Sequence, residues 1–179
     1  MDLIKTKRFM LRPMTENDIN LDYVSWWNAP DIQAGLTSVA CHWGRTHAVR
    51  HVRQFNNRNN FHLGIFNKNR FLIGFFAIFL NFKSQIATCN IVVGNKQYWG
   101  KKVSDEVGLA VIDFIFSQPG FVKIKTETLG SNRSSIALQK RFGLLPEAIL
   151  RQEKKGINGV REDLYLFGLL KTDWLQENS

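Results

Sequence analysis

One stretch, residues 90–116, constrains the fold more than any other, because it passes from a strand to a helix through a short basic loop. The β-branched residues 91–93 favour a strand, and apolar residues recur at three- and four-residue spacing over 103–114, as in a helix. The loop between them contains Gly100 and two lysines. The first N–H groups of a helix have no intrahelical partner and favour an anion, so this arrangement predicts a phosphate site, with Ser104 as the helix N-cap.

Two common phosphate-binding fingerprints do not fit this loop. A Walker loop needs a fixed spacing between its glycines and a Lys-Ser/Thr pair, and a dinucleotide-binding turn needs three spaced glycines. The stretch has neither spacing. Most loops with glycine and lysine before a helix are only connections, so the phosphate prediction needs support from other segments.

The run Tyr98-Trp99-Gly100-Lys101-Lys102-Val103-Ser104, followed by Glu106, resembles the acyl-CoA pyrophosphate loop of GCN5-related N-acetyltransferases (GNAT). It is most similar to the branch of ribosomal-protein N-terminal and amino-sugar acetyltransferases. The resemblance implies that acetyl-CoA is the co-substrate, with its pyrophosphate among the backbone N–H groups of Lys101, Lys102, Val103 and Ser104. The branch has glycine where this chain has Lys102, so a Cβ and a positive charge stand beside the expected phosphates.

The segment from Asn132 to Gly143 resembles a second family motif, Asn-x-x-Ser-Ile-x-Leu-Tyr-x-x-x-Gly. The resemblance implies that Asn132 and Ser135 lie beside CoA. Gln139 occupies the position of the Tyr that usually protonates the departing thiolate. A thiolate with a pKa of ~8.5 leaves near neutral pH without full protonation, so a missing acid would slow the reaction within a range of ~10²–10⁴ and not abolish it.

The run Trp26-Trp27-Asn28-Ala29-Pro30 resembles the Trp-x-Asn-x-Pro segment of amino-sugar acetyltransferases. The resemblance implies that Trp26, Trp27 or Asn28 lies at the rim of the acceptor cleft. A helix end with aromatic side chains in the core explains the same run without any function. The resemblance as a whole extends from Lys7 to Trp174.

Hydrophobic periodicity along the rest of the chain predicts a mixed α+β fold. We expect strands at 7–13, 61–67, 71–80, 86–93 and 121–128, a hairpin over 147–170 with its last strand running on to Trp174, and helices at 14–28, 45–57, 103–116 and 131–142. The crossover rule makes 121–128 parallel to 86–93. The resemblance implies a GNAT fold, with a mostly antiparallel sheet of about seven strands, a parallel pair splayed at the cofactor cleft and about four helices. The length of 179 residues predicts one domain, 1–179.

The chemistry of acetyl transfer narrows the catalytic candidates. An attacking amine must be neutral, so an ammonium with a pKa of ~10 must lose a proton. We expect backbone N–H groups at Ile91, Val92 and Val93 to polarise the thioester carbonyl. The candidate bases are Glu127 and His62. Gln139 stands at the position of the usual acid and could offer the thiolate a hydrogen bond, but no acid proton. The alternatives are that Glu127 is a solvated carboxylate, that His62 is a structural histidine, and that a chain of water molecules takes the proton in place of a protein base.

Charge and cysteine content limit the other classes of function. The net charge of +9 suits nucleic acid, acidic lipid or a ligand rich in phosphate. The basic residues are scattered, so we do not expect nucleic acid as a partner. Cys41 and Cys89 give neither a disulfide framework nor a metal spacing. His47 and His51 share a helix face without a third ligand, so we expect a solvated face and no metal.

The resemblance implies an N-acetyltransferase that moves an acetyl group from acetyl-CoA to a primary amine by direct attack in a ternary complex. The Trp-Trp-Asn-Ala-Pro run favours a small amine, such as a nucleotide-linked amino sugar. The alternatives are a protein N-terminal acetyltransferase of the ribosomal type, a catalytically impaired CoA-binding protein, and a basic nucleic-acid module. The chain shows neither a signal peptide nor an apolar run of ~20 residues, so we expect a cytoplasmic protein that does not enter a membrane. A homodimer is left open.

Overall fold

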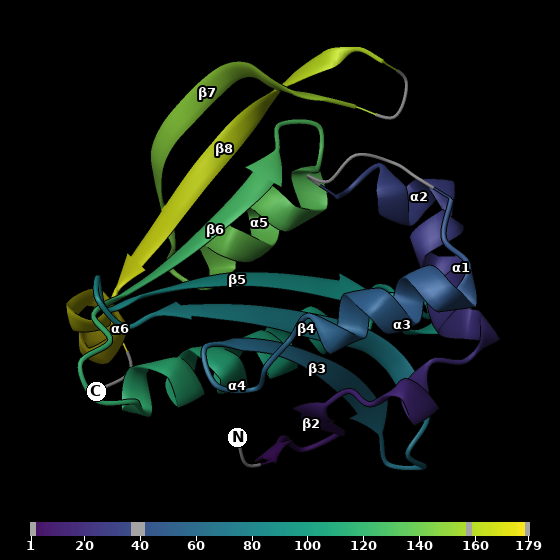
Figure 1. Cartoon of the computed structure of the whole chain (residues 1–179). Helices are drawn as coiled ribbons and strands as arrows, with labels where there is room; N and C mark the ends of the chain where they lie inside the picture. Colours follow the sequence, from purple (N-terminus) through teal and green to yellow (C-terminus); the bar gives the residue numbers. More distant parts are fainter. Residues whose placement is uncertain (1–2, 37–41, 157–158, 178–179) are drawn as a thin grey trace.

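A single sheet of eight strands organises the chain in the computed structural model, which describes residues 3–36, 42–156 and 159–177 (Figure 1). The spatial order is β1-β2-β3-β4-β5-β6-β8-β7. The strands are β1 (Ile4–Lys5), β2 (Phe9–Pro13), β3 (Asn60–Asn67), β4 (Leu72–Asn81), β5 (Ile86–Val93), β6 (Lys123–Leu129), β7 (Leu145–Lys155) and β8 (Arg161–Leu170). The α-helices of the described residues are α1 (Leu21–Asn28), α2 (Pro30–Gln33), α3 (Arg45–Arg53), α4 (Val103–Ser117), α5 (Arg133–Arg141) and α6 (Lys171–Glu177).

The pairing of the strands confirms the predicted mixed topology. All neighbours are antiparallel except β5 and β6, which run parallel on either side of the α4 crossover. The continuous apolar run of β4 lies between β3 and β5, and its interior residues are buried up to Ile78. A strand that is covered on both faces has no need of polar alternation, which explains its sequence.

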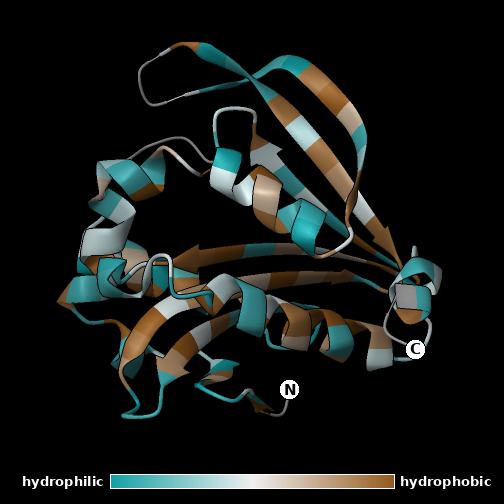
Figure 2. Ribbon diagram, turned by 180° about the vertical axis from the view of Figure 1, so that it is seen from behind, coloured by the Kyte–Doolittle hydropathy of each residue, from teal (hydrophilic) through white to brown (hydrophobic). Residues whose placement is uncertain are grey.

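Helices cover the two faces of the sheet differently. Phe61, Ile78 and Ala87 point to one face and pack with the apolar stripe of α4 and with Leu138 and Phe142 of the α5 segment. Phe75 points to the other face and packs with α1, α2 and α3. Figure 2 shows the apolar residues concentrated on the central strands between these layers.

The parallel pair is short. Within the described residues, β5 and β6 pair only from Ile86↔Lys123 to Thr88↔Lys125. Beyond this point the two strands diverge (Figure 1), as the family resemblance implied. Their carboxyl ends therefore stand apart as an opening in the middle of the sheet.

The predicted helix over 14–28 is wrong as a single element. Thr15 and Asp18 do form the expected capping box, in which Thr15 N donates to Asp18 Oδ2 at 2.8 Å. Thr15 Oγ1 also donates to Asp18 Oδ2, at 2.9 Å. That box opens only a 3₁₀ turn, Glu16–Asp18. The backbone is extended at Ile19, and the Asn20 side chain accepts from Tyr23 N and starts a new helix, α1.

Two other predicted boundaries also fail. The helix expected over 45–57 ends at Arg53, because Asn56 Oδ1 accepts from the backbone N–H groups of Arg58 and Asn59 and forms a turn instead. The strand expected to reach Trp174 ends at Leu170, and helix α6 follows. Trp174 is buried there, and its Nε1 donates to Asp113 Oδ1 of α4 at 3.0 Å.

The remaining strands agree with the prediction to within a few residues, and β1 was not foreseen. Cys41 and the tip of the β7–β8 turn at 157–158 lie outside the described residues. None of the described helices has the length and apolar character needed to cross a bilayer.

Candidate active site

A cavity of about 1240 Å³ follows the opening between β5 and β6. Its wall includes Gly100 and Lys102 at one end, Ile91 and Thr128 at the diverging strands, and Phe55 on the far side of the sheet. The predicted phosphate loop and the predicted acceptor side therefore share one continuous space. Such a concave, mostly apolar space with a few polar groups is typical of a ligand site.

The loop before α4 is built by local hydrogen bonds. Asn95 caps a 3₁₀ turn over Lys96–Tyr98, and Trp99 Nε1 donates to Val93 O at 2.7 Å. The N–H of Lys101 donates to Tyr98 O at 3.3 Å. Because this N–H is already engaged, the groups that remain for a phosphate begin at residue 102.

Lys102, and not Ser104, is the N-cap of α4, so the predicted cap is wrong. The first intrahelical bond runs from Glu106 N to Lys102 O at 3.2 Å. The N–H groups of Val103, Ser104 and Asp105 precede this bond and have no acceptor within the helix. They form the positive end of the α4 dipole, and Ser104 lies within that first turn.

The backbone of Lys102 adopts the left-handed conformation, with φ 55° and ψ 33°. A lysine there carries a steric cost that glycine does not. The structure thus explains why the family prefers glycine at this position. The side chain lies in the cavity wall, exposed to solvent, and forms no ion pair with any described residue.

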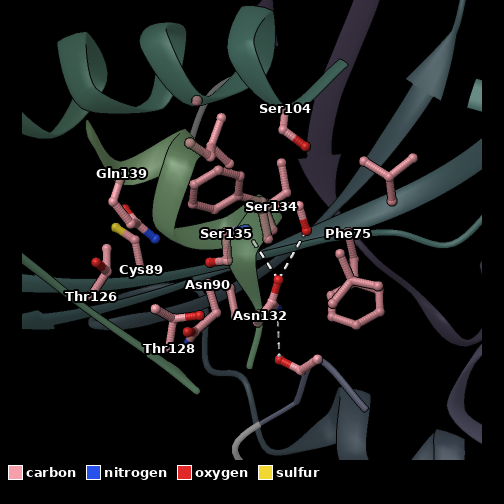
Figure 3. A pocket seen from close by; sticks show the side chains of 18 of the residues that line it. Phe75, Cys89, Asn90, Ser104, Thr126, Thr128, Asn132, Ser134, Ser135 and Gln139 are labelled. Carbon is pink, nitrogen blue, oxygen red and sulfur yellow. Dashed lines mark hydrogen bonds between the residues drawn. The ribbon is translucent and has the colours of Figure 1, made fainter. Parts of the chain in front are cut away.

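The cleft between the strands holds polar groups that the protein itself leaves unsatisfied. The hydroxyls of Thr126 and Thr128 on β6 are buried and have no hydrogen-bond partner among the described residues. Gln139 of α5 is also buried, at 8% exposed, on the same side of the sheet (Figure 3). Cys89 of β5 lies near them, and its burial raises the pKa of the thiol to about 12, so this thiol stays protonated. Buried polar atoms without partners indicate a place for a ligand that supplies them.

Asn132 closes the cleft at its outer end. It is the N-cap of α5, and its Oδ1 accepts from Ser135 N at 3.0 Å and from Ser134 Oγ at 2.9 Å. Its Nδ2 donates to Gly35 O at 3.3 Å, across the mouth of the cleft. Both Asn132 and Ser135 line the cavity, but the Asn132 side chain is already committed to these structural bonds.

A family model for the acetyltransferase (GNAT) domain matches residues 8–145. The chain belongs to the GNAT family. Membership makes it an acetyl-CoA-dependent N-acetyltransferase, and acetyl-CoA is its co-substrate. The unsatisfied hydroxyls of the cleft and the open first turn of α4 suit the amide-rich arm and the pyrophosphate of that molecule.

Solved structures share the fold of this GNAT chain at low sequence identity. A Vibrio cholerae spermidine N-acetyltransferase with CoA and spermine superposes with a TM-score of 0.83 at 17% identity, over 93% of this chain and 98% of the other. A ribosomal L7/L12 alpha-N-protein acetyltransferase with CoA gives 0.85 at 15% identity, over 97% and 99%. A ribosomal-protein-S5-alanine acetyltransferase from Vibrio fischeri gives 0.82 at 14%, over 97% and 99%. No curated protein sequence matches the chain.

The sheet face that α1 and α3 cover is the side on which the acceptor is expected. Strand alternation and the observed register place Thr88, Asn90, Glu127 and His62 on this face. Gln139, by contrast, lies with α5 on the other face, where the thiol arm of CoA is expected. The predicted catalytic residues are therefore brought to one cavity but divided between its two sides.

His62 is part of a buried network and not a free base. Its Nε2 is 2.9 Å from Tyr23 Oη, and its Nδ1 has no partner among the described residues. Burial, with a smaller effect of His51, lowers the pKa of His62 to about 3. Taking a proton from an ammonium would then be uphill by several pKa units. This favours Glu127, which is half-buried and lines the cavity, over His62.

The residues predicted for the rim of the acceptor cleft mainly pack in, or brace, the core under α1. Trp27 stacks between Trp43 and Phe75, with ring centroids 4.0 and 5.1 Å apart. Asn28 holds Trp43 through bonds to its backbone N–H and carbonyl, both at 2.9 Å. Among the described residues that line the cavity, Trp27 is the one drawn from the Trp-Trp-Asn-Ala-Pro run.

The solvated face expected for His47 and His51 is wrong for His51. His51 is half-buried against Trp27 and Phe55, and burial, followed by the charge of His47, lowers its pKa to about 4. His47 stacks on Trp43 at 4.3 Å. In the described part of the chain, no three His, Cys, Asp or Glu side chains lie close enough to hold a metal.

Sequence reasoning missed Thr126, Thr128 and Asn90 as residues of the cleft. The alternation of Thr126 and Thr128 on the inner face of a strand was a usable signal, since neighbouring Lys125 and Glu127 point the other way. Nothing local indicated that their hydroxyls would lack partners.

Proposed function

We propose that this GNAT enzyme acetylates a small primary amine, such as a nucleotide-linked amino sugar, by direct attack within a ternary complex. The observation that supports a small, non-polycationic acceptor is the chemistry of the acceptor wall. It is formed largely by apolar and aromatic side chains, including Phe55, Phe79 and Val92. A polyamine needs several carboxylates for its ammonium groups, whereas an amino sugar has apolar ring faces that pack on such a wall.

The two carboxylates that face this side of the cavity support the same view. Asp31 pairs with Lys96 at the surface, so its charge is already matched. Glu127 makes no ion pair with any described residue. One available carboxylate is enough to take a proton from a single amine, and we assign this role to Glu127, directly or through a water molecule.

The thioester carbonyl is proposed to lie beside the unpaired edge of β5. In an antiparallel ladder, alternate residues of a strand turn their N–H and C=O groups away from the partner strand. Residues 91–93 pair with β4 on one side, so the groups that turn away face the opening. An N–H there would stabilise the negative charge that develops on the carbonyl oxygen.

The departing thiolate is proposed to meet amide and hydroxyl groups and no strong acid. Gln139 stands in the cleft where the family motif has Tyr, with Thr126 and Thr128 on the facing strand. Hydrogen bonds from these groups stabilise a thiolate with a pKa of ~8.5, which need not be protonated as it leaves.

The test is a thiol-release assay with acetyl-CoA over three classes of amine: nucleotide-linked amino sugars, polyamines, and peptides with a free N-terminus. Release that depends on an amino sugar supports the proposal. Faster release with spermidine or with a ribosomal-type peptide overturns the choice of acceptor and leaves acetyl transfer intact.

A catalytically impaired CoA-binding protein is the second candidate. It is favoured by Gln139 at the position of the acid and by the strained backbone of Lys102. CoA binding in calorimetry with no thiol release on any of the three classes would support this candidate.

A further inference from the structure

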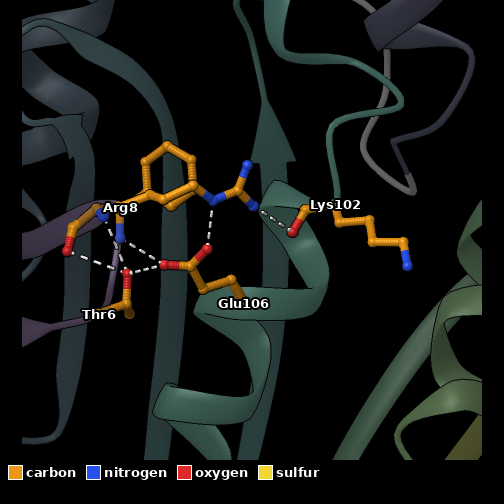
Figure 4. A network of polar contacts seen from close by, with 5 residues as sticks. Thr6, Arg8, Lys102 and Glu106 are labelled. Carbon is orange, nitrogen blue, oxygen red and sulfur yellow. Dashed lines mark hydrogen bonds and ion pairs between the residues drawn. The ribbon is translucent and has the colours of Figure 1, made fainter.

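Glu106 of α4 is surrounded by donors from the β1–β2 turn, which lies about a hundred residues earlier in the chain (Figure 4). Thr6 Oγ1 donates to Glu106 Oε1 at 2.6 Å, and Arg8 N donates to the same oxygen at 2.7 Å. Arg8 Nε donates to Glu106 Oε2 at 2.6 Å. Burial raises the pKa of this carboxyl, but the bonds from Thr6 and Arg8 outweigh it and the net pKa is lowered. Glu106 is therefore held as a carboxylate in one orientation.

The guanidinium of Arg8 also makes a contact toward the phosphate loop. Its Nη2 donates to Lys102 O at 3.3 Å, on the side opposite the extended Lys102 side chain (Figure 4). The same carbonyl accepts the first intrahelical bond, from Glu106 N. Arg8 thus touches both ends of the first turn of α4, the carboxylate of Glu106 and the capping carbonyl of Lys102.

The peptide unit that joins Lys102 to Val103 transmits this contact to the cleft. A trans peptide is planar, and its C=O and N–H point in opposite directions. A bond that fixes the direction of Lys102 O therefore fixes the direction of Val103 N–H, which belongs to the open first turn. This matters here because Lys102 holds a left-handed backbone conformation that costs energy in a residue with a Cβ.

We propose that Arg8 is a positioning residue for acetyl-CoA: it does not touch the co-substrate but orients the N–H groups at the start of α4 through Lys102 O and Glu106. The proposal rests on acetyl-CoA binding at this loop. Simple fold stability is not a sufficient account of the contact, because the ion pair is open to solvent on its Arg8 side, at 41% exposed against 20% for Glu106, and solvent weakens the contribution of an ion pair to stability.

Arg12 supplies a matched control. It pairs with Asp18 at 2.6 Å, its side chain is 36% exposed, and its guanidinium lies over Phe66 as that of Arg8 lies over Phe9. Arg12 is absent from the described lining of the cavity. Replacing either arginine by methionine removes one positive charge and one ion pair while keeping most of the apolar stem.

The experiment measures the Kd of CoA by calorimetry for wild type, Arg8→Met, Arg8→Lys and Arg12→Met at one salt concentration. We expect Arg8→Met to weaken binding about five- to tenfold and Arg12→Met to change it by less than about twofold, because only the first loosens groups that bond a charged ligand. Arg8→Lys should give an intermediate loss, since an ammonium lacks the fork needed to reach both oxygens. The Val103 amide resonance should shift in Arg8→Met and stay in place in Arg12→Met.

Several results would overturn the proposal. Equal CoA affinity in Arg8→Met and Arg12→Met, or an unchanged Val103 amide in Arg8→Met, shows that Arg8 is only structural. If wild type binds CoA and Arg8→Met binds it equally well, the proposal fails and the function of the cleft stands. If wild type binds no CoA, both fail. If Arg8→Met does not fold, the Kd of CoA is compared between Arg8→Lys and Arg12→Lys, and equal values overturn the proposal.

Discussion

The backbone of Gly94, directly after β5, packs against the indole of Trp26 in α1. A Cβ at position 94 would come 1.9 Å from Trp26 Cδ2, closer than any real contact. Trp26 is 6% exposed and Gly94 is buried, so neither can move aside cheaply. This contact fixes α1 to the end of the strand that enters the phosphate loop, and it gives Trp26 a structural role.

We therefore expect Gly94→Ala to destabilise the protein by ~2–3 kcal/mol, through overpacking of a rigid ring. Urea unfolding would measure this. Gly44→Ala is the control, because a Cβ at Gly44 meets nothing within 4 Å. If the two variants are equally stable, the packing of α1 on β5 is looser than the structure shows.

Lys102→Gly should leave the fold intact and change the Kd of CoA by less than about tenfold, because the loss of a charge and the relief of the left-handed backbone oppose each other. Salt screens exposed charges over ~8–10 Å, so the variant should also bind with a flatter salt dependence. Kd values at low and high salt decide this. An identical salt slope in wild type and Lys102→Gly, with a flatter slope in Lys101→Ala, would assign the phosphate contact to Lys101.

Glu127→Gln tests the proposed base. It should lower kcat by ~10²-fold or more at neutral pH, since general-base catalysis contributes about this much, and it should leave the Kd of CoA unchanged. Glu147→Gln, which removes a carboxylate that pairs with Lys123 at the outer surface, is the control. A kcat within about threefold of wild type would point to a chain of water molecules in place of Glu127.

Gln139→Tyr tests whether protonation of the thiolate limits turnover. If it does, the phenol supplies an acid and kcat rises. Stopped-flow thiol release would show this, with Gln139→Leu as the variant that removes the hydrogen bond alone. A flat or lower kcat in Gln139→Tyr means that the thiolate leaves unaided or that another group supplies the proton.

His62 should make the protein sensitive to acid. Its pKa is about 3 in the folded protein and ~6.5 in the unfolded chain. Below pH ~6.5 the unfolded chain binds a proton that the native state excludes, so stability is full above this pH and falls as the pH drops toward 3. From pH 7 to pH 5 the loss from this group is about 2 kcal/mol.

His62→Gln should reduce that part of the pH slope while other groups keep theirs. Unfolding free energies at pH 7 and pH 5 for wild type and variant give the difference directly. Equal slopes in His62→Gln and wild type would mean that His62 is not held neutral in the fold.

The sequence allowed the strand-loop-helix unit and the closing hairpin to be predicted, because their signals are local: β-branched runs, glycine turns and helical spacing. The parallel pair followed from the handedness rule for a strand-helix-strand crossover. It did not predict where side chains from distant segments meet. The Arg8–Glu106 contact and the Tyr23–His62 contact join residues far apart in the chain. The helical spacing of His51 predicts a solvated face, yet the rings of Trp27 in α1 and His62 in β3 pack against it.

The predicted boundaries of several helices were wrong for a different reason. Asn20, Asn56 and Lys102 each begin or end an element by a hydrogen bond or a backbone angle that the residue type permits but does not require. Ser104 is the better N-cap by preference alone. Because Lys102 is the cap and holds the left-handed conformation, α4 begins at Val103, before Ser104.

The short pairing of β5 with β6 leaves two strand edges unpaired in the interior of the sheet. An unpaired edge elsewhere in a protein is a template on which another chain can add a strand and begin to aggregate. Here the edges face each other across a cavity whose wall includes α5, and the bond from Asn132 to Gly35 links the start of α5 to the segment after α2. The fold thereby keeps backbone groups available to a small molecule while denying them to a second polypeptide.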